Sequence, residues 1–135
     1  MYKRQGSAKD APLCAEIAST VNAALPGTCH DLAGRTQLEE AIALVAKARA
    51  MVSNDSGLMH VAAALGVPQV AIFGSSSPLH TPPLSPLAQV IWLKQDAHYQ
   101  PPLDCAPCFA RQCPLGHTRC LGDVTVAMVV ARLDA

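Results

Sequence analysis

The segment from residue 51 to residue 73 constrains the fold most, because two apolar runs flank an alanine-rich run of helical length. Residues 50–53 and 69–73 have the composition of buried strands, and residues 56–65 predict a helix that ends at Gly66. Two strands joined by such a helix lie parallel, with a right-handed crossover. The segment therefore predicts an open parallel α/β sheet.

The rest of the chain continues this alternation. The expected elements are a helix at about 10–24 capped by Asp10, a strand around 29–32, a helix from a capping box at 36–39 to about 48, a strand near 89–93 and a final helix at about 124–133. We expect a Rossmann-like open parallel sheet with helices on both faces. Its ligand site should lie at the carboxyl ends of the strands, along the turns after Leu32, Ser53 and Phe73.

Composition restricts the class of protein further. The chain has 135 residues, half of them hydrophobic, which is enough for one domain with a core, and no apolar stretch is long enough to span a bilayer. Ten basic residues balance ten acidic ones, and only 4% of residues are aromatic, so we expect no nucleic-acid partner. No apolar segment follows the first residues, which indicates a soluble cytoplasmic protein.

The turn before the second predicted helix has the residues of a binding site. Asp55 is expected to cap the helix while its outer oxygen stays free, and Ser56 adds a hydroxyl group. Gly57 allows a ligand to approach the backbone, and the amides through Leu58 can bind a phosphate or diphosphate. His60 lies one turn further along. Plain capping remains the alternative for Asp55, and a hydrogen-bonded core position the alternative for His60.

The run from residue 53 to residue 78 resembles glycosyltransferase family 9. It contains Asp-Ser-Gly-Leu-Met-His, then Val-Ala-Ala-Ala-Leu-Gly-Val-Pro, then Ile-Phe-Gly-Ser-Ser-Ser-Pro. The resemblance extends from Gly6-Ser7-Ala8-Lys9-Asp10 through Asp31-Leu32-Ala33-Gly34-Arg35-Thr36 to Cys105-Ala106-Pro107-Cys108 and onward to the C-terminus. Within the family, the chain resembles most the members that add the second heptose to the inner core of lipopolysaccharide.

This resemblance implies an inverting transfer of heptose from ADP-heptose to a heptosyl-Kdo-lipid A acceptor. The family has two Rossmann-like domains facing across a cleft, the GT-B arrangement, and this chain is similar to most of the C-terminal, donor-binding one. The resemblance places the base, an aspartate, in the N-terminal domain and a phosphate-contacting Thr/Lys loop upstream of Gly6. We therefore expect no catalytic residue here, no cofactor, and an acceptor bound through the missing domain of an enzyme peripheral to the cytoplasmic face of the inner membrane.

The resemblance also implies further donor contacts. Asp55 would accept hydrogen bonds from sugar hydroxyls, while Arg35 and Thr36 would contribute to the nucleoside pocket. Gly74 and Ser75 would form a wall of the same pocket. A solvated charge and a helix cap are the structural alternatives for Arg35 and Thr36.

The first five residues, Met-Tyr-Lys-Arg-Gln, match a translated transposon-type sequencing adapter, whereas the family-like sequence begins at Gly6. We therefore expect residues 1–5 to be a non-native start. Residues 6–135 should then be a single, truncated nucleotide-sugar-binding domain.

The segment 105–120 is rich in cysteine. Four of the six cysteines follow the pattern Cys105-x2-Cys108-x4-Cys113-x6-Cys120, with His117 inside the span. We expect a loop of unpaired thiols; a structural zinc and a redox-sensitive loop are the alternatives, since the spacing departs from the usual pair of zinc knuckles. Cys14 and Cys29 are expected to be small core residues.

Three other functions fit the same sequence. The chain could belong to a family 9 heptosyltransferase with a different acceptor, to a non-catalytic nucleotide-binding domain, or to a zinc-binding domain. An intact gene without an N-terminal half would favour the second, and stoichiometric zinc whose removal unfolds the chain would favour the third.

Overall fold

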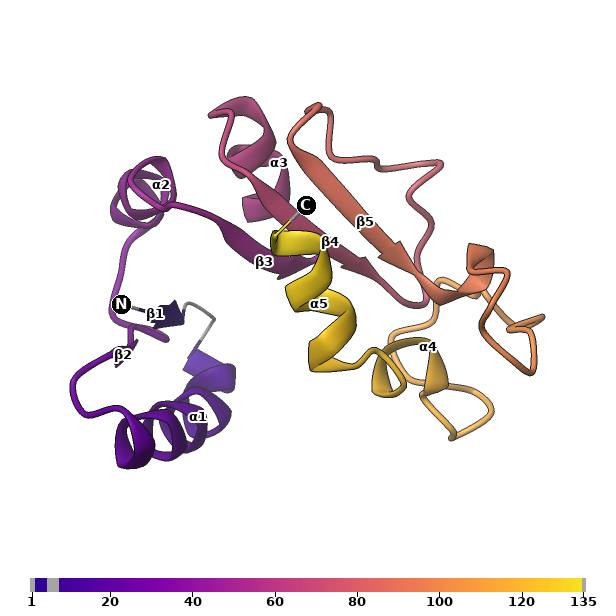
Figure 1. The fold of residues 1–135 in the computed structure, drawn as a ribbon, viewed down its shortest axis with the longest axis horizontal. Coiled ribbons are helices and arrows are strands. Elements are labelled where there is room, and N and C mark those ends of the chain that lie inside the picture. Colours follow the sequence, from indigo (N-terminus) through magenta and orange to yellow (C-terminus); the bar gives the residue numbers. More distant parts are fainter. Residues whose placement is uncertain (1, 5–7, 135) are drawn as a thin grey trace. The chain divides into compact units, whose positions relative to one another are not determined.

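The computed structural model describes residues 2–4 and 8–134 (Figure 1). Of the expected non-native start, residues 1 and 5 lie outside the described residues, and so does Gly6, where the family-like sequence begins. The chain divides into two compact units, Met1–Leu44 and Val45–Ala135, which are described in turn.

The first unit contains a small parallel sheet and one long helix. Strand β1 (Tyr2–Arg4) pairs with β2 (Cys29–Asp31), and between them lie a 3-10 turn, η1 (Ala8–Asp10), and helix α1 (Ala11–Ala24). The side chain of Asn22 fixes α1 to β2, because its Nδ2 donates to the carbonyl of Cys29 at 2.8 Å and its Oδ1 accepts from the Cys29 N–H at 3.0 Å. Cys29 and Cys14 are buried, as predicted.

The second unit is built on a three-stranded parallel sheet. Its strands are β3 (Met51–Asn54), β4 (Gln69–Phe73) and β5 (Ala88–Trp92), in the spatial order β3-β4-β5 (Figure 1). Helix α3 (Gly57–Ala64) connects β3 to β4, and Gly66, with φ +67°, ends it in the left-handed conformation that glycine favours. This arrangement confirms the expected parallel α/β fold.

Helices cover both faces of this sheet. Ala71 and Phe73 of β4 pack against Met59 of α3, whereas Ile72, which points to the opposite face, lies beside helix α5 (Val126–Leu133). Figure 1 shows α3 and α5 on the two sides of the strands. Phe73 and Met59 are fully buried, so the core lies between α3 and β4.

The remaining elements of this unit are short. A 3-10 turn, η2 (Leu93–Gln95), follows β5, and helix α4 (Arg119–Gly122) precedes α5. Residues 96–118 form neither helix nor strand. No helix of the described part of the chain is both long enough and apolar enough to cross a membrane.

One predicted helix cap is shifted by a residue, and the other lies at the predicted position. The predicted capping box at residues 36–39 would start the next helix at Gln37. Helix α2 instead spans Leu38–Ala46, one residue later. Glu40, and not Glu39, accepts a hydrogen bond from the backbone N–H of Gln37, at 2.8 Å. Asp10 occupies the N-cap position of α1, but its side chain makes no capping hydrogen bond.

Candidate functional site

The turn between β3 and α3 leaves its backbone open. The N-cap of α3 is Ser56, in extended backbone (φ −156°, ψ 164°), so the prediction that Asp55 caps this helix is wrong. Asp55 precedes the cap, and its Oδ2 accepts a hydrogen bond from Thr81 Oγ1 at 3.3 Å. A Cβ added at Gly57 would meet no atom within 4 Å. The first-turn N–H groups of Gly57 and Leu58 have no partner within the helix.

Two buried polar atoms near the same edge have no hydrogen-bond partner among the described residues: Ser53 Oγ and Trp92 Nε1. Ser53 pairs in register with Ala71, and Trp92 pairs with Phe73, which places both on the face of the sheet that α3 covers. Unpaired buried polar atoms are uncommon in native proteins. The sequence did not single out either residue.

His60 lies on α3 and is exposed. The alternative that it is a core residue is therefore wrong, and its side chain is accessible to a ligand. Leu58, one of the residues expected to act through its backbone, is half-buried.

Gly74 and Ser75 follow β4 and hold the cysteine-rich segment. A Cβ at Gly74 would lie 2.6 Å from Leu121 Cγ, so only glycine allows α4 to approach this closely. The carbonyl of Ser75 accepts a hydrogen bond from the Phe109 N–H at 2.8 Å. Both residues thus contact the segment that follows β5.

Arg35 and Thr36 belong to the first unit, after β2. The N–H of Arg35 donates to the carbonyl of Leu32 at 3.1 Å, in a turn where Gly34 has φ +68°. The Arg35 side chain is exposed, and Thr36 is half-buried.

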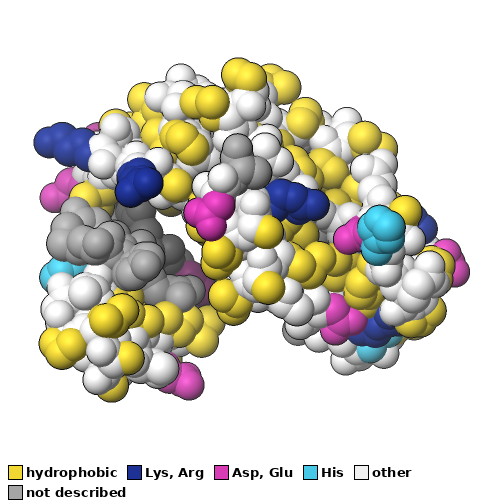
Figure 2. All heavy atoms as spheres, viewed as in Figure 1, with side chains coloured by type: hydrophobic (Ala, Val, Ile, Leu, Met, Phe, Trp, Pro, Cys, Tyr) yellow, Lys and Arg dark blue, Asp and Glu magenta, His cyan; other side chains and the backbone are white. Residues whose placement is uncertain are grey.

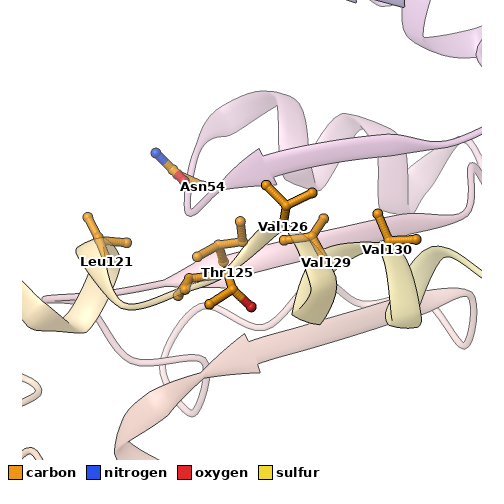
Figure 3. Close-up of a pocket in the computed structure, with 8 residues that line it drawn as sticks. Asn54, Leu121, Thr125, Val126, Val129 and Val130 are labelled. Atoms are coloured by element: carbon orange, nitrogen blue, oxygen red, sulfur yellow. The ribbon is translucent and has the colours of Figure 1, made fainter.

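An apolar hollow of about 320 Å³ lies beside α5. Figure 3 shows Val126, Val129 and Val130 along the hollow, with Leu121 at one end and Asn54 at the end of β3. Hydrophobic side chains reach the surface around α5 (Figure 2), where Val126 is 80% exposed. This apolar lining does not fit a diphosphate, and none of the predicted donor-binding residues belongs to it.

A second hollow, of about 130 Å³, is lined by all four cysteines of the segment 105–120, with His117, Arg111 and Ser75. Burial raises the pKa of the Cys120 thiol, and the charges of the other three thiolates raise it further. The N–H of Thr118 hydrogen-bonds the Cys113 sulfur and lowers the pKa of that thiol, and the N–H groups of residues 115–117 act in the same direction.

All six cysteines are unpaired. Within the described residues, no three His, Cys, Asp or Glu side chains already stand grouped closely enough to hold a metal ion. The two cysteines outside the segment, Cys14 and Cys29, are buried in the first unit.

A polar network lies next to the cysteines. Tyr99 donates a hydrogen bond to Asp123, which raises the pKa of the Tyr99 phenol and lowers the pKa of the Asp123 carboxyl. Arg119 pairs with Asp123 at 3.3 Å and lies over the Tyr99 ring, 5.3 Å from its centroid. Its guanidinium also donates to the carbonyl of Pro101 at 3.1 Å, which ties α4 to the segment after β5.

The fold is that of an α/β protein with an open parallel sheet, and comparison with known sequences gives the family. The profile of glycosyltransferase family 9 (heptosyltransferase) matches residues 5–119. The chain therefore belongs to glycosyltransferase family 9.

Individual relatives give a narrower comparison. The chain is 45% identical over 130 residues to lipopolysaccharide heptosyltransferase 2 of Escherichia coli (strain K12), covering 96% of this chain and 35% of that protein. It is 54% identical over 93 residues to lipopolysaccharide heptosyltransferase 2 of Salmonella typhimurium, covering 69% of this chain and 27% of that protein.

A solved structure, that of E. coli ADP-heptose lps heptosyltransferase II, matches with a TM-score of 0.76 at 41% identity, over 98% of this chain and 34% of the other. The chain spans about a third of the length of the relatives that it matches.

Proposed function

We propose that this chain supplies the donor site of an inverting heptosyltransferase that moves heptose from ADP-heptose to the heptosyl-Kdo-lipid A inner core of lipopolysaccharide. The observation that carries the proposal is the open turn at Gly57, at the carboxyl edge of a parallel sheet in a family 9 chain. Ligands of open α/β sheets bind at this edge. The names of the relatives give ADP-heptose and lipopolysaccharide, and the particular acceptor and the inversion are part of the proposal.

In this proposal the amides of residues 56–58 bind the diphosphate. They are first-turn N–H groups, and the dipole of α3 favours an anion there by about 0.3–1 kcal/mol. Negative charge grows on the departing diphosphate during transfer, so the same donors stabilise the transition state more than the ground state. Exposed His60 is positioned one helical turn away to contact the phosphates.

Asp55 binds the sugar in the proposal. Its Oδ2 accepts from Thr81, which holds the carboxylate in place, and about three of the four acceptor sites of the carboxylate remain for sugar hydroxyls. Since Asp55 does not cap α3, its carboxylate is available for this contact. Arg35 and Thr36 contribute to the nucleoside pocket, and Gly74 and Ser75 to its wall.

We assign the catalytic base and the acceptor site to the part of the enzyme that this chain does not span. Residues 6–135 then act as a C-terminal nucleotide-sugar-binding domain, without a cofactor, in an enzyme at the cytoplasmic face of the inner membrane. The isolated chain should bind ADP or ADP-heptose weakly and transfer nothing, because general-base activation of the acceptor hydroxyl is absent.

Amide chemical shifts test the location of the site. Titration of the labelled 135-residue chain with ADP should move the N–H resonances of Ser56, Gly57 and Leu58 most. Adenosine without phosphate should leave those three resonances nearly unchanged. Shifts confined to other turns would refute the assignment, and measurable heptose transfer by this chain alone would refute the assignment of the base.

A further inference from the structure

We propose that the stacked rings of His80 and Phe109 form a platform for the sugar ring of the donor. The two ring centroids lie 5.6 Å apart, with an angle of 30° between the ring planes, and Phe109 is 57% exposed. Neither residue belongs to the proposed diphosphate site. The inference deepens the proposed function and rests on it, because it names a contact that distinguishes ADP-heptose from ADP.

Two hydrogen bonds place this platform at the carboxyl edge of the sheet, near Asp55. The Phe109 N–H donates to the carbonyl of Ser75 at 2.8 Å, two residues beyond the end of β4. Thr81, the residue after His80, donates from its Oγ1 to Asp55 Oδ2 at 3.3 Å. Ligands of open α/β sheets bind at this edge. The platform therefore lies at the edge where the donor is proposed to bind.

The loop that carries His80 is held by a buried serine. Ser77 is 2% exposed, and its carbonyl accepts hydrogen bonds from the N–H groups of His80 at 3.1 Å and Thr81 at 3.3 Å. Its Oγ accepts from the Leu79 N–H at 3.2 Å. Because these bonds order the loop, a ligand binds without the entropic cost of ordering it.

The backbone of Phe109 is strained. Its φ is +54°, in the left-handed region that a residue with a Cβ seldom adopts. Strained residues of this kind cluster at ligand-binding sites. A single exposed apolar side chain is ordinary, but Phe109 is also held by strained backbone and stacked on a second ring. This combination indicates a binding surface.

The chemistry of a sugar ring fits this surface. A pyranose ring has a face of C–H bonds whose hydrogens are weakly positive, and the face of an aromatic ring is negative. His80 stacks on one face of the Phe109 ring, so the sugar would stack on the other. Asp55 would accept hydrogen bonds from the hydroxyls at the edge of the sugar. An aromatic face near a carboxylate thus matches a ligand with an apolar face and a polar edge.

Calorimetric titration of the 135-residue chain with ADP and with ADP-heptose tests the platform. Phe109→Ala should weaken the binding of ADP-heptose by about three- to tenfold and leave that of ADP unchanged. Its Tm should change little, because the lost ring is largely exposed and the Cβ remains. Phe109→Tyr keeps the ring and should bind ADP-heptose as the unchanged chain does. Equal weakening of both ligands in Phe109→Ala, or none, would overturn the platform.

Matched variants separate ring stacking from other effects. His80→Phe keeps two stacked rings and should retain the affinity for ADP-heptose, whereas His80→Ala should lower it. Leu79→Ala removes a 72% exposed side chain from the same loop without touching the stack, and should change neither affinity. A loss in His80→Phe as large as that in Phe109→Ala would show that the imidazole itself binds the ligand, and would overturn the stacking.

The two ligands also separate this inference from the proposed function. If the unchanged chain binds ADP and ADP-heptose equally well, the diphosphate site stands and the platform is refuted. If the chain binds neither ligand, the proposed function fails and the platform fails with it. A higher affinity for ADP-heptose than for ADP, with a difference that Phe109→Ala narrows, supports both.

Discussion

Replacing Gly74 by alanine should destabilise the second unit through a single contact. The new Cβ would lie 2.6 Å from Leu121 Cγ and 2.8 Å from Leu121 Cδ2. Carbon atoms pack at about 3.5–4.0 Å, so the overlap is roughly 1 Å with each atom. Rotation about χ2 leaves Cγ in place, so the contact is relieved only by a change of the χ1 rotamer of Leu121 or by a shift of α4. Overpacking of this kind costs about 1–3 kcal/mol.

A double-mutant cycle in urea or by thermal melting measures this contact. Each kcal/mol should lower the Tm of Gly74→Ala by about 2–8 °C in a domain of this size class. Leu121 is 44% exposed, so Leu121→Ala alone should cost little. The double variant should regain the loss, with a coupling free energy of about 1 kcal/mol or more. If Gly74→Ala costs the same free energy of unfolding in the unchanged chain and in the Leu121→Ala chain, the reasoning is refuted.

Two further predictions concern polar contacts. Asp55→Ala should cost at most about 1 kcal/mol of folding free energy, because it loses the Thr81 hydrogen bond and no cap, yet it should strongly reduce transfer in a full-length enzyme. Thermal melts and transfer assays check this, with Asp55→Asn as the control that keeps an acceptor for Thr81; a large stability loss would restore the capping role. The Tyr99 phenol should ionise at a higher pH than free tyrosine, because its neutral form donates to Asp123 and its phenolate would face a carboxylate. The measurement is an absorbance titration of a Tyr2→Phe chain, in which Tyr99 is the remaining tyrosine. Asp123→Asn should lower the pKa of Tyr99 in that chain, and an unchanged pKa would contradict the hydrogen bond.

The elements of the parallel sheet could be predicted because their signals are local. The apolar run at Gln69–Phe73 and the glycine that ends α3 at Gly66 occur as expected. Strand β1 (Tyr2–Arg4) and helix α4 (Arg119–Gly122) were not predicted. Each is only three or four residues long, so neither shows a full hydrophobic period.

The site was predicted less completely, for two physical reasons. Asp55 and Ser56 are equally good capping residues, so composition cannot decide which one starts α3. The contact between Asp55 and Thr81 joins residues 26 positions apart, and no local pattern indicates it. The pairing of Ser53 with Ala71, which places its hydroxyl on the α3 face, likewise follows only from the register of the sheet.

The cysteine-rich segment shows the same limit. The four cysteines and their spacing are visible in the sequence, but the spacing alone favours unpaired thiols. That the four line one hollow, with His117 3.9 Å from Cys105, depends on how an irregular segment folds.

Calorimetric titration of ADP against the unchanged chain and Gly57→Val tests the central claim most directly. A Cβ added at Gly57 meets no protein atom within 4 Å, so the fold should persist while the ligand's approach to the α3 amides is blocked. Affinity for ADP should fall at least about tenfold, or 1.4 kcal/mol, with little change in Tm. Ala64→Val, an exposed position at the other end of the same helix, is the matched control and should bind ADP normally. Unchanged ADP affinity in a folded Gly57→Val chain would contradict the account and place the diphosphate elsewhere.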